Sequence, residues 1–479
     1  MLFNSLQFAV FLPVVFTLYW LIPHKFRWIL LLASSYYFYM GWNAKYVFLI
    51  LFTTVASYCA GLGLEKAATK KAKKAILAGT LAACLGVLFV FKYLDFFFNT
   101  VTAVCSLFAI RLSPLTVKIL LPVGISFYTF QTLSYVIDVY RGTVPAEHHF
   151  GIYATFVSFF PQLVAGPIER TGNLLHQIRE EHVFNYHQAT YGLKLMAWGF
   201  FKKMVVADNL AVYVDRVYNN LPENSGLSLF IATAFAMMQI YCDFSGYSDI
   251  ARGASKLMGI ELMENFKSPF FSTSIKQLWG RWHLSLTTWF RDYVYFPLGG
   301  NRVSKIRHYF NLLVTFMLSG LWHGANWTFV IWGGLSAVGQ IIEEILKIKP
   351  NKKQGSFWWF VRAGLVYLFL CAIAVFFRAQ NLQEVGYIYA HVFDGIGNIR
   401  HYIGSGILAL GLDKVSFLWR CALYFVPVGI FDYYSLKTDV IDWVGERRPV
   451  IRHGIYILLI ALITIFHAYG EVNFVYFQF

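Results

Sequence analysis

LSGLWHGANWTFVIWGG, residues 318–334, combines apolar residues typical of a membrane segment with a histidine and an asparagine at its centre. His323 and Asn326 lie at this centre, beside Trp322 and Trp327. Polar side chains are costly to bury in lipid, and those that occur in membrane segments usually line a cavity or take part in chemistry. The stretch therefore predicts a membrane protein with a buried polar site.

The rest of the chain supports a membrane environment. Of its 479 residues, 58% are hydrophobic and 14% are charged, and its mean hydropathy is +0.54. Soluble domains carry about 25% charged residues, and a membrane-crossing helix needs roughly 20 apolar ones. We expect crossing or re-entrant segments near residues 3–22, 26–43, 45–64, 75–98, 117–138, 151–167, 190–212, 226–248, 309–346 (at least two passes), 357–377, 416–436 and 450–469.

These segments predict an all-α polytopic membrane protein with about 11–13 transmembrane or re-entrant helices. No internal repeat or soluble module interrupts them, so we expect one membrane domain over residues 1–479. Within it, residues 1–142 form N-terminal helices, residues 150–346 form a core with the polar stretches, and residues 357–479 form C-terminal helices.

The net charge of +15 is concentrated in short loops. Short loops rich in Lys and Arg stay on the cytoplasmic side of a membrane. We therefore expect the basic loops 65–74, 301–308 and 346–353 to face the cytoplasm, and the N-terminus, 379–415 and the terminal NFVYFQF (473–479) to lie outside. No aromatic and basic surface module accompanies the charge, which argues against nucleic-acid binding.

The cysteines and the nucleotide motifs exclude other classes of site. The six cysteines are dispersed and contain no C-x-x-C pair, so they predict neither a disulfide framework nor a zinc site. The sequence contains no G-x-x-x-x-G-K-[ST] motif, so ATP-driven transport is not indicated. We expect no metal and no bound cofactor.

A second polar stretch, QIYCDFSGYSDIARG (239–253), places Asp243 and Asp249 at the end of an apolar run. Two interpretations are open: acid or base groups of an active site, or members of buried ion pairs. The ion pairs are favoured, because buried charges are usually paired. The expected partners are Arg252, Arg281 and Arg291.

A third polar stretch, WGRWHLSLTTWFRDYVYFPLGGNR (279–302), places Arg281 and His283 among aromatic residues. This amphipathic pattern is typical of a segment that lies along the membrane interface or re-enters the membrane.

The depth of His323 follows from the length of the segment before it. At 1.5 Å per residue, a helix over 309–321 is about 20 Å long, less than the roughly 30 Å of a hydrocarbon core. His323 is then expected within the membrane, unless the helix includes the basic loop. Gly320 and Gly324 would allow the backbone to break there, or another helix to approach closely.

SGLWHGANWTFVIWGG (319–334) closely resembles the histidine motif of the membrane-bound O-acyltransferases, in particular their bacterial AlgI-like branch, which O-acetylates alginate and similar polysaccharides. Several further stretches match in family order along most of the chain, which makes the resemblance specific. They are LPVGISFYTFQTLSYVIDVYRG (121–142), FPQLVAGPIER (160–170), QIYCDFSGYSDIARG (239–253), RWHLSLTTWFRDYVYFPLGGNR (281–302), VFFRAQ (375–380) and NFVYFQF (473–479). The resemblance implies the fold of that family, with helices around a buried catalytic cavity.

The resemblance also implies a reaction in the bacterial inner (cytoplasmic) membrane. An acyl group, usually acetyl, passes from a cytoplasmic thioester donor, either acetyl-CoA or an acyl carrier protein, toward hydroxyls of an exported cell-surface polysaccharide. An extracytoplasmic acyltransferase often completes the transfer in related systems. We expect the terminal FVYFQF (474–479) to help position such a partner, or to anchor at the membrane interface.

His323 matches the family's catalytic histidine, and His283 matches the second histidine, in R-W-H-x-S. Imidazole has an unperturbed pKa of about 6.5, which suits a general base near neutral pH. Asn326 or the N–H of Trp322 would stabilise the oxyanion if aimed at it. A structural histidine and packing tryptophans are the alternatives, and His283 could orient the site without touching the proton. Supporting candidates are Arg281, Asp243 and Asp249.

The chain departs from the family pattern just before His283. The family commonly has an acidic residue and a second arginine there, whereas this chain has Gln277 and Gly280. That weakens the case for an ion pair that orients His283.

Two rival functions remain open. The D-alanyl-transferring branch of the family, of the DltB type, shares the architecture but moves D-alanine to teichoic acid. A transporter or flippase would move substrate without making bonds, but it would need broken helices in corresponding halves of the chain. The sequence shows no such pair.

Overall fold

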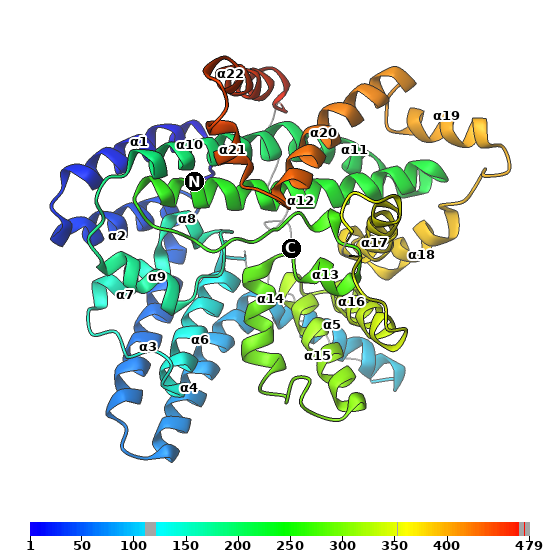
Figure 1. Cartoon of the computed structure of the whole chain (residues 1–479). Coiled ribbons are helices and arrows are strands. Elements are labelled where there is room, and N and C mark those ends of the chain that lie inside the picture. The colour runs from blue at the N-terminus through cyan, green and yellow to red at the C-terminus, as the bar shows by residue number, and fades with distance from the viewer. Residues whose placement is uncertain (111–120, 352, 469–473, 475–479) are drawn as a thin grey trace. The chain divides into compact units, whose positions relative to one another are not determined.

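The computed structural model describes residues 1–110, 121–351, 353–468 and 474. Of these described residues, 76% are helical and none lies in a strand (Figure 1). The predicted all-α class is therefore confirmed.

Side chains at the helix starts explain where several of these helices begin. Ser5 accepts a hydrogen bond from the Phe8 amide at the start of α1 (Leu6–Leu21), and Thr69 accepts one from Ala72 at the start of α4 (Lys70–Leu88). Such caps satisfy backbone amides that have no partner within the helix. Three later helices begin in the same way, after Ser356, Asn381 and Asp413.

Contacts within the chain divide it into two compact units. The first unit comprises Met1–Leu193 and Ala251–Met263. Its helices pack mainly as α3 on α6, α3 on α4, and α2 on α7. They are α1, α2 (His24–Met40), η1 (Ala44–Tyr46), α3 (Val47–Lys66), α4, η2 (Phe89–Tyr93), α5 (Leu94–Leu107), α6 (Ile125–Arg141), α7 (Phe150–Ser158), α8 (Phe160–Leu163) and α9 (Thr171–Arg179).

The second unit comprises Lys194–Ile250 and Glu264–Phe479, and it holds both predicted histidines. Two helices, α10 (Tyr186–Phe200) and α12 (Leu227–Leu257), contribute residues to both units. The other helices of the second unit are η3 (Phe201–Ala207), α11 (Asp208–Tyr218), η4 (Leu221–Glu223), η5 (Pro269–Phe271), α13 (Ile275–Trp279), α14 (Leu284–Phe290), η6 (Arg291–Tyr295), α15 (Lys305–His323), α16 (Trp327–Ile345), α17 (Phe357–Arg378), α18 (Leu382–His391), α19 (Ile399–Ala409), α20 (Lys414–Ser435), α21 (Val440–Gly445) and α22 (Pro449–Phe466). The expected single domain with three parts stays a prediction.

Among the described residues, six helices are long and apolar enough to cross a membrane. They confirm a multi-pass membrane protein, while the expected total of about 11–13 crossing or re-entrant helices stays a prediction. The six are Ala44–Lys66, Lys70–Leu107, Leu227–Leu257, Phe357–Arg378, Lys414–Ser435 and Pro449–Phe466.

The opening stretch forms a tight hairpin of α15 and α16, which lie side by side (Figure 1). A side chain at Gly320 would collide with the backbone of Phe329, and one at Gly333 with the backbone of Phe316. The close helix approach expected at Gly320 is therefore confirmed, and the helix also ends at Gly324, as expected.

The first arm of this hairpin is longer than we expected. It begins at Lys305, inside the basic loop, because the amide of His308 already bonds to the carbonyl of Ser304. The 19 residues of α15 span about 28 Å. Helix length therefore does not decide the depth of His323.

The segment η3 has an irregular turn that positions two lysines of the second unit. The segment η3 is a π-helix, wider than an α-helix, and it carries Lys202 and Lys203. Its neighbour Gly199 lies against Gly246 of α12, where an added side chain would meet the opposing backbone. The small residues allow the two lysines to reach α12.

Candidate active site

His323 is the last residue of α15, and only 4% of its surface is exposed. Aromatic rings surround it: Trp332 of α16 lies edge-on at 5.2 Å between ring centroids, and Phe377 of α17 lies at 5.5 Å. The helix break at Gly324 thus places the predicted base inside the protein, at the end of a rigid hairpin.

His283 lies beside His323, with 6.1 Å between their ring centroids. It is 2% exposed, and Phe244 of α12 packs edge-on against its ring at 4.6 Å. Its backbone is left-handed, with φ of +44°, a conformation that is uncommon for residues other than glycine. We call His283 and His323 the histidine pair.

The surroundings of His283 favour a neutral imidazole at this residue. His283 lies outside the six candidate membrane helices. Burial, and after it the nearby His323, hold the pKa of His283 well below its ordinary value. A neutral imidazole carries one nitrogen that accepts a proton, as a general base requires.

The space directly at His323 is small. A cavity of about 10 Å³ is lined by His323, Trp282, Trp332 and Phe377, among others. That volume holds at most about one water molecule. An acyl group can reach His323 only if neighbouring side chains move.

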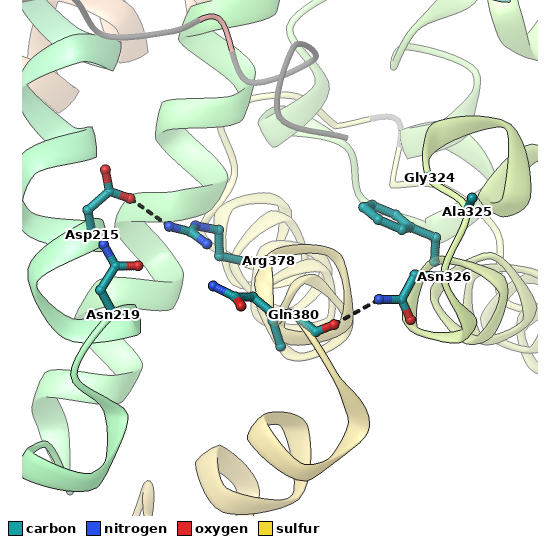
Figure 2. Close-up of a pocket in the computed structure, with 9 residues that line it drawn as sticks. Asp215, Asn219, Gly324, Ala325, Asn326, Arg378 and Gln380 are labelled. Carbon is teal, nitrogen blue, oxygen red and sulfur yellow. Dashed lines mark hydrogen bonds and ion pairs between the residues drawn. The ribbon is translucent and has the colours of Figure 1, made fainter. Parts of the chain in front are cut away.

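A larger polar cavity of about 560 Å³ opens beside the turn that follows His323 (Figure 2). Asp215 and Arg378 form an ion pair in its wall, with 2.6 Å between carboxylate oxygen and guanidinium nitrogen. Gly324 and Phe329 also line it. We call this space the polar cavity.

Asn326 caps α16 and lines the polar cavity. Its side-chain oxygen accepts a hydrogen bond from the Thr328 amide, and its nitrogen donates to the carbonyl of Gln380 at 2.8 Å (Figure 2). Asn326 would have to release Gln380 before that nitrogen stabilised an oxyanion. Its oxyanion role stays a prediction.

The structure places the other supporting candidates at different distances from the chemistry. The Trp322 ring lies 5.1 Å from that of His323 and 5.9 Å from that of His283, so it belongs to the site. The guanidinium of Arg281 donates to the carbonyl of Phe271. Arg281 therefore supports the loop that leads into His283.

Asp243 and Asp249 are buried ion-pair members, as favoured from the sequence. The partners that the structure gives differ from the arginines we expected: Asp243 pairs with Lys203, and Asp249 with Lys202, each at 2.7 Å. Lys203 also pairs with Asp208 at 2.7 Å. These five residues form the lysine–aspartate cluster.

Sequence reasoning missed the two lysines because they lie in the apolar stretch 190–212, which we interpreted only as a membrane segment. Two adjacent lysines and an aspartate five residues later were the available signal. Arg378 was present in the quoted VFFRAQ, but its partner Asp215 is distant in sequence.

Most of the terminal NFVYFQF lies outside the described residues. Phe474 is described, and it is 2% exposed, packed 4.9 Å from the ring of Tyr247 and 6.2 Å from that of Phe244. Phe474 therefore packs on an aromatic surface of α12, and the expected roles of the terminus in positioning a partner or anchoring at the membrane interface stay predictions.

Comparisons with known proteins show what the chain is similar to. The sequence model of the membrane-bound O-acyltransferase family matches residues 145–382, which include the histidine pair. The "Probable alginate O-acetylase AlgI" of Pseudomonas putida is 35% identical over all of both chains. The "Peptidoglycan O-acetyltransferase" of Helicobacter pylori is 32% identical, over 80% of this chain and 78% of its own length. The "Teichoic acid D-alanyltransferase" of Streptococcus thermophilus is 29% identical, over 52% of this chain and 64% of its own length.

Proposed function

The chain belongs to the membrane-bound O-acyltransferase family and is an O-acyltransferase, and from this premise we propose its substrates and its chemistry. It transfers an acetyl group from a cytoplasmic thioester donor, acetyl-CoA or an acyl carrier protein, toward hydroxyls of an exported polysaccharide. The protein is located in the bacterial inner membrane.

The observation that supports this proposal is the buried histidine pair, with 6.1 Å between the rings. His323 ends a helix whose tight hairpin fixes its position, and aromatic side chains exclude water around it. A base in such surroundings takes a proton from a bound hydroxyl without competition from bulk water.

The reaction is an acyl exchange that needs no further reactant. His323 accepts the proton of the acceptor hydroxyl while the hydroxyl oxygen bonds to the thioester carbon. The carbon–sulfur bond then breaks, and the proton passes to the departing sulfur. His283 lies close enough to orient His323 or to hold a proton during this exchange.

The polar cavity suits the acceptor side of this reaction. Its wall carries a carboxylate, a guanidinium and amide groups, which hydrogen-bond hydroxyls. Phe377 contacts both Phe329, in the cavity wall, and His323, with centroid distances of 5.0 and 5.5 Å. Movement of Phe377 would join the polar cavity to the small space at His323.

We keep an extracytoplasmic acyltransferase as the proposed partner that completes the transfer. This partner rests on the family resemblance alone, whereas the relatives' names, which describe acylation of polysaccharides, support the proposed acceptor. The D-alanyl alternative has weaker support, because the named D-alanyltransferase matches only 52% of this chain.

The proposal is tested with labelled donors and membranes of the source cells, which contain the full chain and any partner that completes the transfer. Acetyl-CoA, acetyl-acyl carrier protein and D-alanyl carrier protein are supplied separately, with envelope glycan from the source cells as acceptor. We expect label in the glycan from one of the acetyl donors, and none with His323→Gln. Incorporation from the D-alanyl donor alone would reject the proposed substrate, and no transfer from any donor would reject the reaction.

A further inference from the structure

His283 occupies an unusual position for a catalytic side chain. It is the N-cap residue of α14, where a side chain commonly accepts a hydrogen bond from the first turn of the helix. Its imidazole makes no such bond, and its backbone is left-handed, with φ of +44° and ψ of +55°. Surrounding contacts must hold this conformation, because a residue other than glycine rarely adopts it.

Asn265 supplies the bonds that the N-cap side chain does not. Its backbone carbonyl accepts from the amide of Leu284 at 2.9 Å. Its side-chain oxygen accepts from the hydroxyl of Ser285 at 2.7 Å and from the Ser285 amide at 3.4 Å. The first turn of α14 is thus capped from outside, and the imidazole of His283 is turned toward His323.

The nitrogen of the Asn265 side-chain amide bonds to a residue of α12. The Asn265 nitrogen donates to the hydroxyl of Ser248 at 3.0 Å. Phe244, one turn earlier on α12, packs edge-on against the His283 ring. Asn265 therefore ties the residues after His283 to the helix that also contacts its imidazole.

The hydrogen bonds of the Asn265 side chain are buried, and a backbone hydrogen bond nearby supports the same segment. Asn265 is 1% exposed, Ser248 2% and Ser285 0%. The amide of Lys267 donates to the carbonyl of Arg281 at 3.0 Å, so the chain near Asn265 also pairs with the residues before His283. Bonds on both sides of His283 lead to the same short segment.

We propose that Asn265 is a positioning residue, which holds the strained backbone at His283 so that its imidazole faces His323. Asn265 acts through His283 and touches no reacting atom. The inference rests on the proposed function, since it requires that His283 takes part in acyl transfer.

The first test is Asn265→Ala in the full chain, with the donor that supports acyl transfer by the wild-type chain. A small displacement of a catalytic group costs about 10²-fold in rate. We expect kcat to fall by about this factor while the KM for the donor is unchanged, because the donor does not contact Asn265.

Asn311→Ala is the matched control for loss of a buried amide. Asn311 is 0% exposed, and its nitrogen donates to the carbonyls of Leu298 and Gly300. We expect it to lower the thermal stability of the solubilised chain as Asn265→Ala does, but to keep wild-type kcat. Equal losses of kcat in the two variants would overturn the proposal, as would wild-type kcat in Asn265→Ala.

Smaller changes decide the matter if Asn265→Ala does not accumulate in the membrane. Ser285→Ala removes one hydroxyl bonded to Asn265 and should lower kcat. Thr288→Ala, one turn further along α14, removes a hydroxyl that donates to the carbonyl of Leu284 and should leave kcat unchanged. Wild-type kcat in Ser285→Ala, or equal losses in both, would overturn the proposal.

His283→Ala separates this inference from the proposed function. Loss of transfer in His283→Ala with wild-type kcat in the Asn265 and Ser285 variants would retain the function of His283 and reject its positioning by Asn265. Wild-type transfer in His283→Ala would reject both the role of His283 and its positioning by Asn265, while the proposed acyl transfer would stand.

Discussion

Two buried regions of the second unit surround their polar side chains in different ways. The histidine pair lies among aromatic rings contributed by α12, α15, α16 and α17. In the lysine–aspartate cluster, each lysine is bound at 2.7 Å to at least one carboxylate, and Lys203 to two. Both regions are costly to bury, and in the second, direct ion pairs bind the charged side chains.

This difference separates chemistry from stability. The charged groups of a buried ion pair resist proton transfer and hold their helices together. Removing one partner would leave an unpaired charge in the protein interior. Aromatic surroundings leave an imidazole able to exchange a proton with a substrate. The histidine pair is therefore expected to control rate, and the lysine–aspartate cluster to control folding.

The largest expected effect separates these roles at His323. Glutamine keeps hydrogen-bonding capacity and similar size but is no base near pH 7. General base catalysis contributes about 10²–10⁴-fold, so we expect His323→Gln to lower acyl transfer by at least this order while the protein still inserts. Transfer and protein abundance are measured together, with the exposed His453→Gln as control. Near wild-type transfer in a well-expressed His323→Gln would contradict the assignment of the histidine pair to catalysis.

The next effect concerns stability. Lys203→Met leaves Asp208 and Asp243 without their shared cation. Breaking a buried ion pair costs about 3–5 kcal/mol, so we expect a loss of this size in the free energy of unfolding, or absence of folded protein. Thermal unfolding of the solubilised chain measures it, and the exposed Lys305→Met is the control. A stable Lys203→Met with reduced transfer would move the lysine–aspartate cluster to the catalytic side of the comparison.

Substitution of Asn326 is expected to have a smaller effect, and it tests whether this residue has a structural or a catalytic role. Loss of an N-cap costs about 1 kcal/mol, whereas loss of an oxyanion donor lowers kcat about 10²–10³-fold. From its bonds to Thr328 and Gln380, we expect Asn326→Ala to lower stability by about the first amount and to retain most activity. A loss of kcat in the range of an oxyanion donor, with unchanged stability, would instead support the oxyanion role.

Two cysteine substitutions that report topology are expected to have the smallest effect on activity. Lys71→Cys lies in the basic loop expected in the cytoplasm, and Asn381→Cys lies in the segment expected outside. We expect an impermeant thiol reagent to label them from opposite sides of the membrane. Labelling of both from one side would contradict the expected orientation.

The sequence predicted the features that depend on local pattern. Long apolar runs gave the helices, and Gly320 and Gly324 gave a close hairpin that breaks beside His323. His283 and His323 were paired through the family resemblance, since no rule of spacing brings residues 40 positions apart into contact.

Features that depend on tertiary packing were predicted poorly. Nearby arginines suggested partners for Asp243 and Asp249, whereas the observed lysines come from η3, about 40 residues earlier. The left-handed backbone at His283 could not be predicted locally: histidine is enriched among the non-glycine residues with positive φ, but such residues are uncommon at any one position. The start of α15 was placed too late because the charges of the basic loop were assumed to end the helix.

The π-helix η3 makes this part of the chain sensitive to its length. Lys203 and Asp208 are paired across five positions, a separation that matches the wide turn rather than an α-helix. In an ordinary α-helix, residues five positions apart lie about 140° apart around the axis, so this pair depends on the wide turn. A related chain that is one residue shorter within Phe201–Ala207 is therefore expected to have an ordinary helical turn there, with its lysine and aspartate four positions apart on one face.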